Sequence, residues 1–284
     1  MSFGSANEQE AVYWNADAAQ HWITHEDRYE RMFGALGEHA LRAAEITPTD
    51  HILDIGCGTG STTLAAARRA SQGDALGIDI SAQMTDRCRQ RAREMGIKNV
   101  RFETADVQTH DFGAAQFDSI ISRFGVMFFD DPLKAFKNVG HAMCSGGRLA
   151  FVCWQDVLAN EWMTIPGSAA AAQVRPADFS HPTASGVFAF ADRDWVAQTL
   201  GLAGFVDVEI SGVRDTLVLA GGASLDETVD FLRGADVARV LFAEAEPEAI
   251  ERAMKAVRDA LRPHETMEGI CLGAAVWVVT ARRP

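Results

Sequence analysis

The sequence has few basic residues relative to its acidic ones. Lys and Arg number 26 against 39 Asp and Glu, which gives a formal net charge of −13. A nucleic-acid binder needs a basic face for the phosphates, and here no five basic residues follow one another. The arginines at Arg68–Arg69 and Arg87–Arg93 recur at helical spacing and are interpreted as solvated helix faces. Nucleic acid is therefore excluded as an expected partner.

Cysteines are also scarce, and no two of them form a C-x-x-C pair. An odd number of scattered thiols argues against a disulfide framework and against a zinc site. We therefore expect reduced thiols, no metal and a cytoplasmic location. The five cysteines are Cys57, Cys88, Cys144, Cys153 and Cys271.

Long apolar runs and a leader segment are missing as well. No apolar stretch reaches about 18 residues, so no membrane span is expected. The first ten residues, MSFGSANEQE, are polar and acidic, which predicts that no signal peptide is present. We expect residues 1–10 to be disordered.

What the chain does have is enough apolar material for a large core. Of its 284 residues, 48% are hydrophobic, which suits one large α/β domain over residues 1–284 that carries insertions.

The stretch His51–Gly60, HILDIGCGTG, organises this domain. It predicts a buried strand, a tight glycine turn and a helix that opens at Ser61. Glycines let a ligand approach the backbone closely, and a helix start presents unpaired N–H groups.

The glycine spacing discriminates between cofactors. A dinucleotide fingerprint is G-x-G-x-x-G, but here Gly60 follows Gly58 by two residues and Ser61 stands where the third glycine belongs. The observed G-x-G-x-G, preceded by Asp54, resembles motif I of the class I S-adenosylmethionine (SAM) dependent methyltransferases. The alternative is a tight turn between strand and helix that binds no ligand.

A second acidic residue supports the cofactor interpretation. The strand expected at Ala75–Ile80 contains Asp79 near its end, 19 residues after Gly60. A carboxylate at about this separation hydrogen-bonds ribose hydroxyls. The alternative is a helix cap, but Ser81 can cap the following helix without Asp79.

The resemblance implies roles for further residues at the ends of the strands. In this family the glycine loop takes the methionine end of SAM, and residues after the second and third strands take the adenosine. Arg123 and Phe124 follow the fourth strand, at the topological switch point. The cofactor-binding residues implied are Asp54, Gly56, Cys57, Gly58, Thr62, Asp79, Ile80, Met84, Ala105, Asp106, Val107, Arg123 and Phe124.

The resemblance further implies an α/β, Rossmann-like fold with a seven-stranded sheet, mostly parallel, whose last strand is antiparallel. We expect one long helix over residues 13–33 and a second over Phe33–Ala44, with residues 10–45 acting as a helical lid. Residues 155–192 are interpreted as an insertion over the active site, and residues 224–262 as a helical insertion between strands six and seven. Strand six is expected to carry a bulge at Gly212.

Apolar residues from several segments predict the acceptor pocket. Trp22, Met127, Phe128, Trp154 and Trp162 are the expected substrate-binding residues, and they imply a small planar or lipophilic acceptor. The resemblance is to methyltransferases of the ubiquinone and menaquinone type. The DNA-methylating motifs Asn/Asp-Pro-Pro-aromatic and Pro-Cys are absent.

The chemistry implied is an in-line displacement at the methyl carbon of SAM. A general base, where the nucleophile needs one, is expected to be a histidine, and the candidates are His21, His25 and His181. Two other functions stay open. One is a SAM-binding module without transferase activity, and the other is a nicotinamide-dependent oxidoreductase, which Ser61 disfavours.

Overall fold

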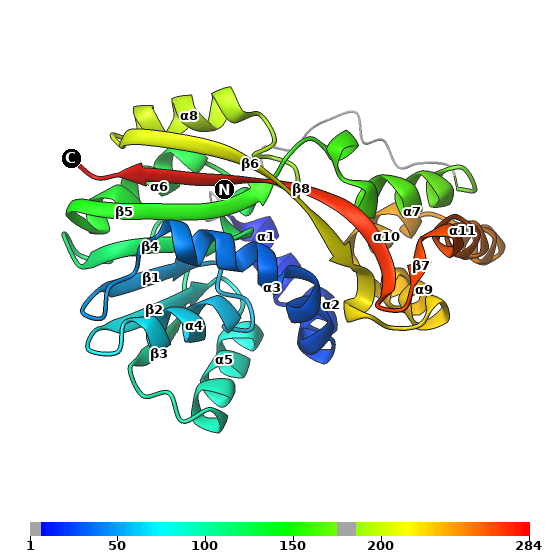
Figure 1. Cartoon of the computed structure of the whole chain (residues 1–284), viewed down its shortest axis with the longest axis horizontal. Coiled ribbons are helices and arrows are strands. Elements are labelled where there is room, and N and C mark those ends of the chain that lie inside the picture. The colour runs from blue at the N-terminus through cyan, green and yellow to red at the C-terminus, as the bar shows by residue number, and fades with distance from the viewer. Residues whose placement is uncertain (1–6, 175–185) are drawn as a thin grey trace, which may run out of the picture.

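The computed structural model describes residues 7–174 and 186–284, which fold around a central β-sheet (Figure 1). Its strands are β1 (His51–Ile55), β2 (Asp74–Asp79), β3 (Val100–Thr104), β4 (Phe117–Arg123), β5 (Met143–Trp154), β6 (Val206–Val218), β7 (Glu265–Thr266) and β8 (Gly269–Arg282). The order is β3-β2-β1-β4-β5-β8-β6, and β7 pairs with β8 off this path. β8 is antiparallel to β5 and β6, whereas the pairs among β1 to β5 are parallel. The predicted Rossmann-like sheet with an antiparallel last strand is confirmed.

Helices cover the two faces of this sheet. They are α1 (Glu8–Trp14), α2 (Asp17–Thr24), α3 (Glu26–Ala43), α4 (Ser61–Arg69), α5 (Ala82–Glu94), α6 (Pro132–Ala142), α7 (Glu161–Ala171), α8 (Arg193–Leu202), α9 (Leu225–Gly234), α10 (Asp236–Phe242) and α11 (Pro247–Leu261). Short 3-10 turns lie at η1 (Gly125–Phe128), η2 (Val157–Ala159), η3 (Leu219–Gly221) and η4 (Arg262–His264). Among the described residues no helix is both long and apolar enough to cross a membrane.

The connections explain why the central strands are buried. From the centre of the sheet, the unit β1-α4-β2 runs towards β3, and the unit β4-α6-β5 runs in the opposite direction, towards β8. Right-handed crossovers therefore place α4 and α6 on opposite faces. α3 packs beside α4, and α8 beside α6. Ile52, Leu53 and Ile55 of β1 are consequently buried, as a strand covered on both faces requires.

The N-terminal helices differ from the two that we expected. Three helices are present, and α3 runs past Phe33 without a break to Ala43. The chain breaks at Asn15 and again at His25, between α2 and α3. The Asn15 side chain donates to the carbonyl of Ile80 and accepts from the N–H of Ala82. α1 begins at Glu8, so the expected disorder of residues 8–10 is wrong.

The prediction of a bulge at Gly212 is also wrong. Gly212 pairs regularly with Trp277 of β8, and the register shift lies between Val206 and Glu209. Asp207 within that interval has a left-handed φ of 51°, which lets the strand accommodate the irregularity.

The last two long strands carry a group of helices to one end of the sheet. β6 and β8 have 13 and 14 residues and extend beyond the carboxyl end of β5 (Figure 1). α9, α10 and α11 lie between them in the chain, and α7 packs against α11. These helices therefore lie beyond the carboxyl ends of the parallel strands β1 to β5.

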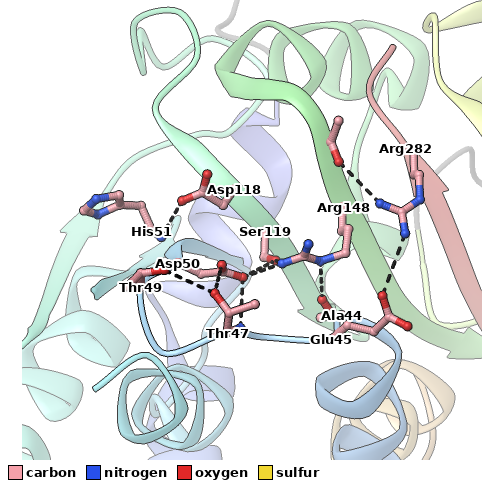
Figure 2. A network of polar contacts seen from close by, with 11 residues as sticks. Ala44, Glu45, Thr47, Thr49, Asp50, His51, Asp118, Ser119, Arg148 and Arg282 are labelled. Carbon is pink, nitrogen blue, oxygen red and sulfur yellow. Dashed lines mark hydrogen bonds and ion pairs between the residues drawn. The ribbon is translucent and has the colours of Figure 1, made fainter. Parts of the chain in front are cut away.

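A polar network lies at the opposite end of the sheet, where the parallel strands begin (Figure 2). Arg148 of β5 donates to the carbonyl of Ala44 at 2.7 Å and to the hydroxyl of Ser119 at 3.1 Å, and it forms an ion pair with buried Asp50. Burial acts to raise the pKa of Asp50, but hydrogen bonds from Thr47 and the charge of Arg148 hold this pKa below its usual value. The network joins the end of α3 to the beginnings of β1, β4 and β5.

We predict that Arg148→Met destabilises the fold by about 3–5 kcal/mol at pH 7, because it leaves the Asp50 carboxylate buried without its cation. A carboxyl with a lowered pKa stabilises the fold above its unfolded pKa and loses this contribution as the pH falls through the folded pKa. The difference in unfolding free energy between Arg148→Met and wild type should therefore become smaller in acid. Urea unfolding at pH 7 and at a pH below 3.8, the ordinary pKa of an aspartate, measures this difference in unfolding free energy.

Arg282→Met is the matched control, since Arg282 is half-exposed and its nitrogen lies 3.7 Å from the Glu45 carboxylate. An exposed pair of this kind contributes about 0–1 kcal/mol. Equal losses of unfolding free energy in the two variants would contradict the role given to the Asp50 network.

Candidate active site

A cavity opens at the carboxyl ends of β1, β2, β4 and β5. One wall is formed by the strand ends and their loops, and the other by residues of α1, α2, α3 and α9. This is where ligands bind in open α/β sheets, at the point where the strand order reverses. Here the reversal lies between β1 and β4.

The glycine loop after β1 forms the floor of this cavity. Gly56 has a φ of 64°, and a Cβ there would lie 2.7 Å from the Cα of Gly125 in the loop after β4. Gly58 has a φ of 53°, but a Cβ at this position would meet nothing within 4 Å. The two loops are therefore packed together at Gly56, while Gly58 presents open space to a ligand.

Asp79 ties the glycine loop to the end of β2. Its carboxylate accepts from the N–H of Gly58 at 2.8 Å and from the N–H of Ser81 at 2.9 Å. The Ser81 hydroxyl accepts from the N–H of Met84 and so caps α5. Burial raises the pKa of Asp79, and the backbone N–H groups oppose this effect. Asp79 lines the cavity and still has unused lone pairs for a ligand.

Asp106 stands at the adjacent wall, after β3. One of its oxygens accepts from the side-chain amide of Asn7 at 2.8 Å and from the N–H of Gln108 at 2.9 Å. The other, Oδ2, is buried and has no hydrogen-bond partner among the described residues. A buried acceptor of this kind is costly unless something donates to it. Asp106 therefore offers an acceptor that fits an amino group of a ligand.

Asp54 occupies a different position from the other predicted carboxylates. It is buried beneath the glycine loop, where it accepts from the Thr63 hydroxyl at 2.7 Å, and it is not among the residues that line the cavity. Burial raises the pKa of Asp54 to about 7. Asp54 thus fixes the first turn of α4 to β1, and direct contact with a cofactor stays a prediction.

The other predicted cofactor residues surround the same space. They lie in the glycine loop, at the start of α4 and α5, and after β3 and β4. The cavity-lining members of the predicted set are Gly56, Cys57, Gly58, Thr62, Asp79, Ile80, Met84, Ala105, Asp106, Val107, Arg123 and Phe124.

Aromatic side chains line the part of the cavity away from the glycine loop. The ring of Phe124 stacks on Trp154 with centroids 4.3 Å apart, and Trp154 lies 4.7 Å from Trp162. Across the cavity, Trp22 stacks on Tyr29 at 3.6 Å. All five predicted substrate residues, Trp22, Met127, Phe128, Trp154 and Trp162, line this space.

Several lining residues were not predicted from the sequence. Glu26, Glu30 and Phe33 recur at three- and four-residue spacing on α3, a pattern that would have placed these carboxylates beside the aromatic rings. Phe231 of α9 comes from far along the chain and carries no local sequence signal.

Two of the three predicted histidines, His21 and His25, lie outside the lining of the cavity. His21 and His25 pack against Phe231, each with its ring centroid 5.4 Å from that of the phenyl ring, and neither is among the lining residues. Burial and the nearby charge of Arg28 lower the pKa of His25. His181 lies outside the described residues.

Comparison with known proteins supports the methyltransferase interpretation independently of the cavity geometry. Residues 52–147 match the family model of a methyltransferase domain. The aklanonic acid methyltransferase DauC of Streptomyces sp. (strain C5) is 33% identical over 128 residues, which cover 43% of this chain and 58% of DauC. The uncharacterized methyltransferase YcgJ of Bacillus subtilis is 30% identical over 112 residues, which cover 39% of this chain and 44% of YcgJ. The chain thus spans about half the length of these curated relatives.

Solved structures share the fold over most of the chain. The crystal structure of YcgJ has a TM-score of 0.55 at 21% identity, covering 87% of this chain and 98% of YcgJ. The geranyl diphosphate C-methyltransferase of Streptomyces coelicolor has a TM-score of 0.57 at 17% identity, covering 100% of both chains. Residues 52–147 therefore match a methyltransferase domain, and the chain around them shares the fold of YcgJ and of the geranyl diphosphate C-methyltransferase.

Proposed function

We propose that this protein transfers a methyl group from SAM to a small aromatic or lipophilic acceptor. The observation that carries the proposal is the composition of the cavity, with the glycine loop, Asp79 and Asp106 at one end and stacked aromatic rings at the other. Similarity to an aklanonic acid methyltransferase and a geranyl diphosphate C-methyltransferase supports a small-molecule acceptor, but it does not support the absence of charge inferred below, since both named acceptors are anionic.

The residues at the polar end fit the groups of SAM. The open space at Gly58 admits a ligand close to the backbone. The Asp79 carboxylate suits the ribose hydroxyls, and the buried Oδ2 of Asp106 suits the amino group of adenine. Ile80, Met84 and Val107 supply apolar surface for the adenine ring.

Charge restricts the acceptor that the aromatic end can take. Arg123 is the only Lys or Arg among the described residues that line the cavity, and it is paired with Glu30. Glu10 and Glu26 line the same cavity. A phosphorylated or carboxylated acceptor would be repelled by these carboxylates. We therefore infer an uncharged acceptor with a flat face that can stack on indole and phenyl rings.

SAM supplies a methyl carbon on a sulfonium. An O, N or C nucleophile attacks this carbon in line, and the carbon–sulfur bond breaks so that S-adenosylhomocysteine leaves. The contribution of this chain is to hold the acceptor in position and to exclude water with the rings of Phe124, Trp154 and Trp162. Correct orientation alone contributes about 7–11 kcal/mol to lowering such a barrier. For a weakly acidic nucleophile we propose a histidine base. Of the sequence candidates His21, His25 and His181, the first two do not line the cavity.

We expect His21→Ala and His25→Ala to lower kcat by less than about threefold, because neither ring lines the cavity and general-base catalysis is worth about 10²–10⁴-fold. His181→Ala tests the remaining candidate. The measurement is turnover at saturating SAM over the pH range 6–9. A loss of a hundredfold or more in either of the first two variants would mean that its imidazole reaches the acceptor.

The acceptor class is tested with methyl-labelled SAM and matched acceptor pairs. Uncharged phenols and quinols should become methylated, whereas the same rings bearing a carboxylate or phosphate should react at least about tenfold more slowly, because a free cation to pair with them is missing from the described cavity wall. Preference for the anionic member of each pair would contradict the inferred acceptor. SAM binding without transfer to any acceptor would favour the alternative of a SAM-binding module.

A further inference from the structure

The helix α7 begins where β5 separates from β8. The two strands pair no further than Val276, and the earlier residues of β8 lie beyond the carboxyl end of β5 (Figure 1). Two side chains at the beginning of α7 bond to this part of β8. Oδ1 of Asn160 accepts from the N–H of Ala275 at 2.9 Å. Oε2 of Glu161 accepts from the N–H of Gly273, also at 2.9 Å. Side chains of α7 thus replace β5 as the partner of β8.

The side chain of Asn160 is buried and uses all of its hydrogen-bonding capacity. Besides the N–H of Ala275, its oxygen accepts from the indole N–H of Trp162 at 3.1 Å. Its amide nitrogen donates to the carbonyls of Gln155 and Asp156 at 3.3 and 3.0 Å. An asparagine side chain has two donor hydrogens and two acceptor lone pairs. All four are engaged, so the amide cannot turn without losing bonds.

The bond to Trp162 takes the place of an ordinary helix cap. Asn160 directly precedes α7, where an asparagine side chain usually accepts from a backbone N–H of the first turn. In the described first turn of α7, no backbone N–H donates to this side chain. Its oxygen instead accepts from the side chain of the second residue of the helix. This asparagine therefore holds an indole ring rather than capping the helix.

The same bond fixes the orientation of Trp162 in the cavity. The centroid of its ring lies 4.7 Å from that of Trp154, with an angle of 43° between the planes, and 6.3 Å from that of Phe33. Trp162 lines the cavity, whereas Asn160 lies behind it and is not among the lining residues. Because the indole N–H is engaged by Asn160, Trp162 offers an acceptor its apolar ring surface.

We propose that Asn160 is a positioning residue for the methyl acceptor, which holds the Trp162 indole in the orientation that packs against a flat ring beside Trp154. This inference rests on the proposed function. The stabilisation from aromatic contacts depends on the mutual orientation of the rings, beyond the apolar area that they bury. Asn160 should therefore affect the choice between flat and non-flat acceptors of equal size, although it does not touch them.

The test uses two uncharged probes that share one carbon skeleton. 2-Naphthol is flat, and its saturated counterpart decahydro-2-naphthol is not. Calorimetric titration of each, at saturating S-adenosylhomocysteine, measures both affinities. Asn160→Ser should weaken 2-naphthol by roughly three- to tenfold, as expected for losing an oriented aromatic contact. It should leave decahydro-2-naphthol and S-adenosylhomocysteine within about twofold of wild type, because the apolar area and the cofactor end of the cavity are unchanged.

Serine is chosen because it caps a helix as well as asparagine does but is too short to reach the indole. Asn160→Asp keeps the accepting oxygen and should keep the preference for 2-naphthol. Trp162→Phe removes the donor and should lose this preference, and adding Asn160→Ser to it should change the ratio of the two affinities by less than about twofold. Glu161→Ala is the matched control, since it removes the neighbouring bond between α7 and β8 without touching Trp162, and it should keep the preference.

The outcomes separate this inference from the proposed function. Wild-type protein that binds S-adenosylhomocysteine but neither probe would overturn the proposed acceptor class, and the inference with it. Wild-type protein that prefers 2-naphthol, with an Asn160→Ser or Trp162→Phe variant that keeps this preference, would overturn the inference alone. An equal loss in Glu161→Ala would do the same, because it would assign the effect to the docking of α7. Thermal unfolding of each variant establishes that the affinities are measured on folded protein.

Discussion

The hydrogen bond from the N–H of Gly58 to the Asp79 carboxylate is the interaction on which the site depends. It joins the loop after β1 to the end of β2, while the contact of Gly56 with Gly125 joins the same loop to the one after β4. The loop is therefore held from both sides of the topological switch point. Its glycine conformations leave one open position, at Gly58, facing the cavity.

The remainder of the cavity is built by segments far from this loop in sequence. β6 and β8 extend past the ends of the parallel strands and carry α9 to α11 to that edge of the sheet (Figure 1). The N-terminal helices close the other side, where Asn7 reaches Asp106 and Asn15 reaches the beginning of α5. The polar network at Asp50 lies at the opposite end of the strands from the cavity (Figure 2).

Local patterns were sufficient to predict the glycine loop, the parallel strands and the positions of Asp79 and Asp106, because each depends on residues close in sequence. Glu30 and Phe231 were missed because they reach the cavity through the packing of helices, which periodicity does not specify. The break at Asn15 was missed for the same reason, since its partners Ile80 and Ala82 lie more than sixty residues away. The placement of His21 and His25 against Phe231 likewise depends on α9.

The most direct test of the account is calorimetric binding of S-adenosylhomocysteine to wild type, Gly58→Val and Gly146→Val. Gly146 also has a positive φ, of 74°, and open surroundings, but it is an exposed residue near the beginning of β5, away from the cavity. Both valines strain the backbone alike, so a difference between the variants reports on the space beside Gly58. The account predicts that Gly146→Val binds like wild type and that Gly58→Val loses at least about a hundredfold in affinity. Unchanged affinity in folded Gly58→Val would contradict it.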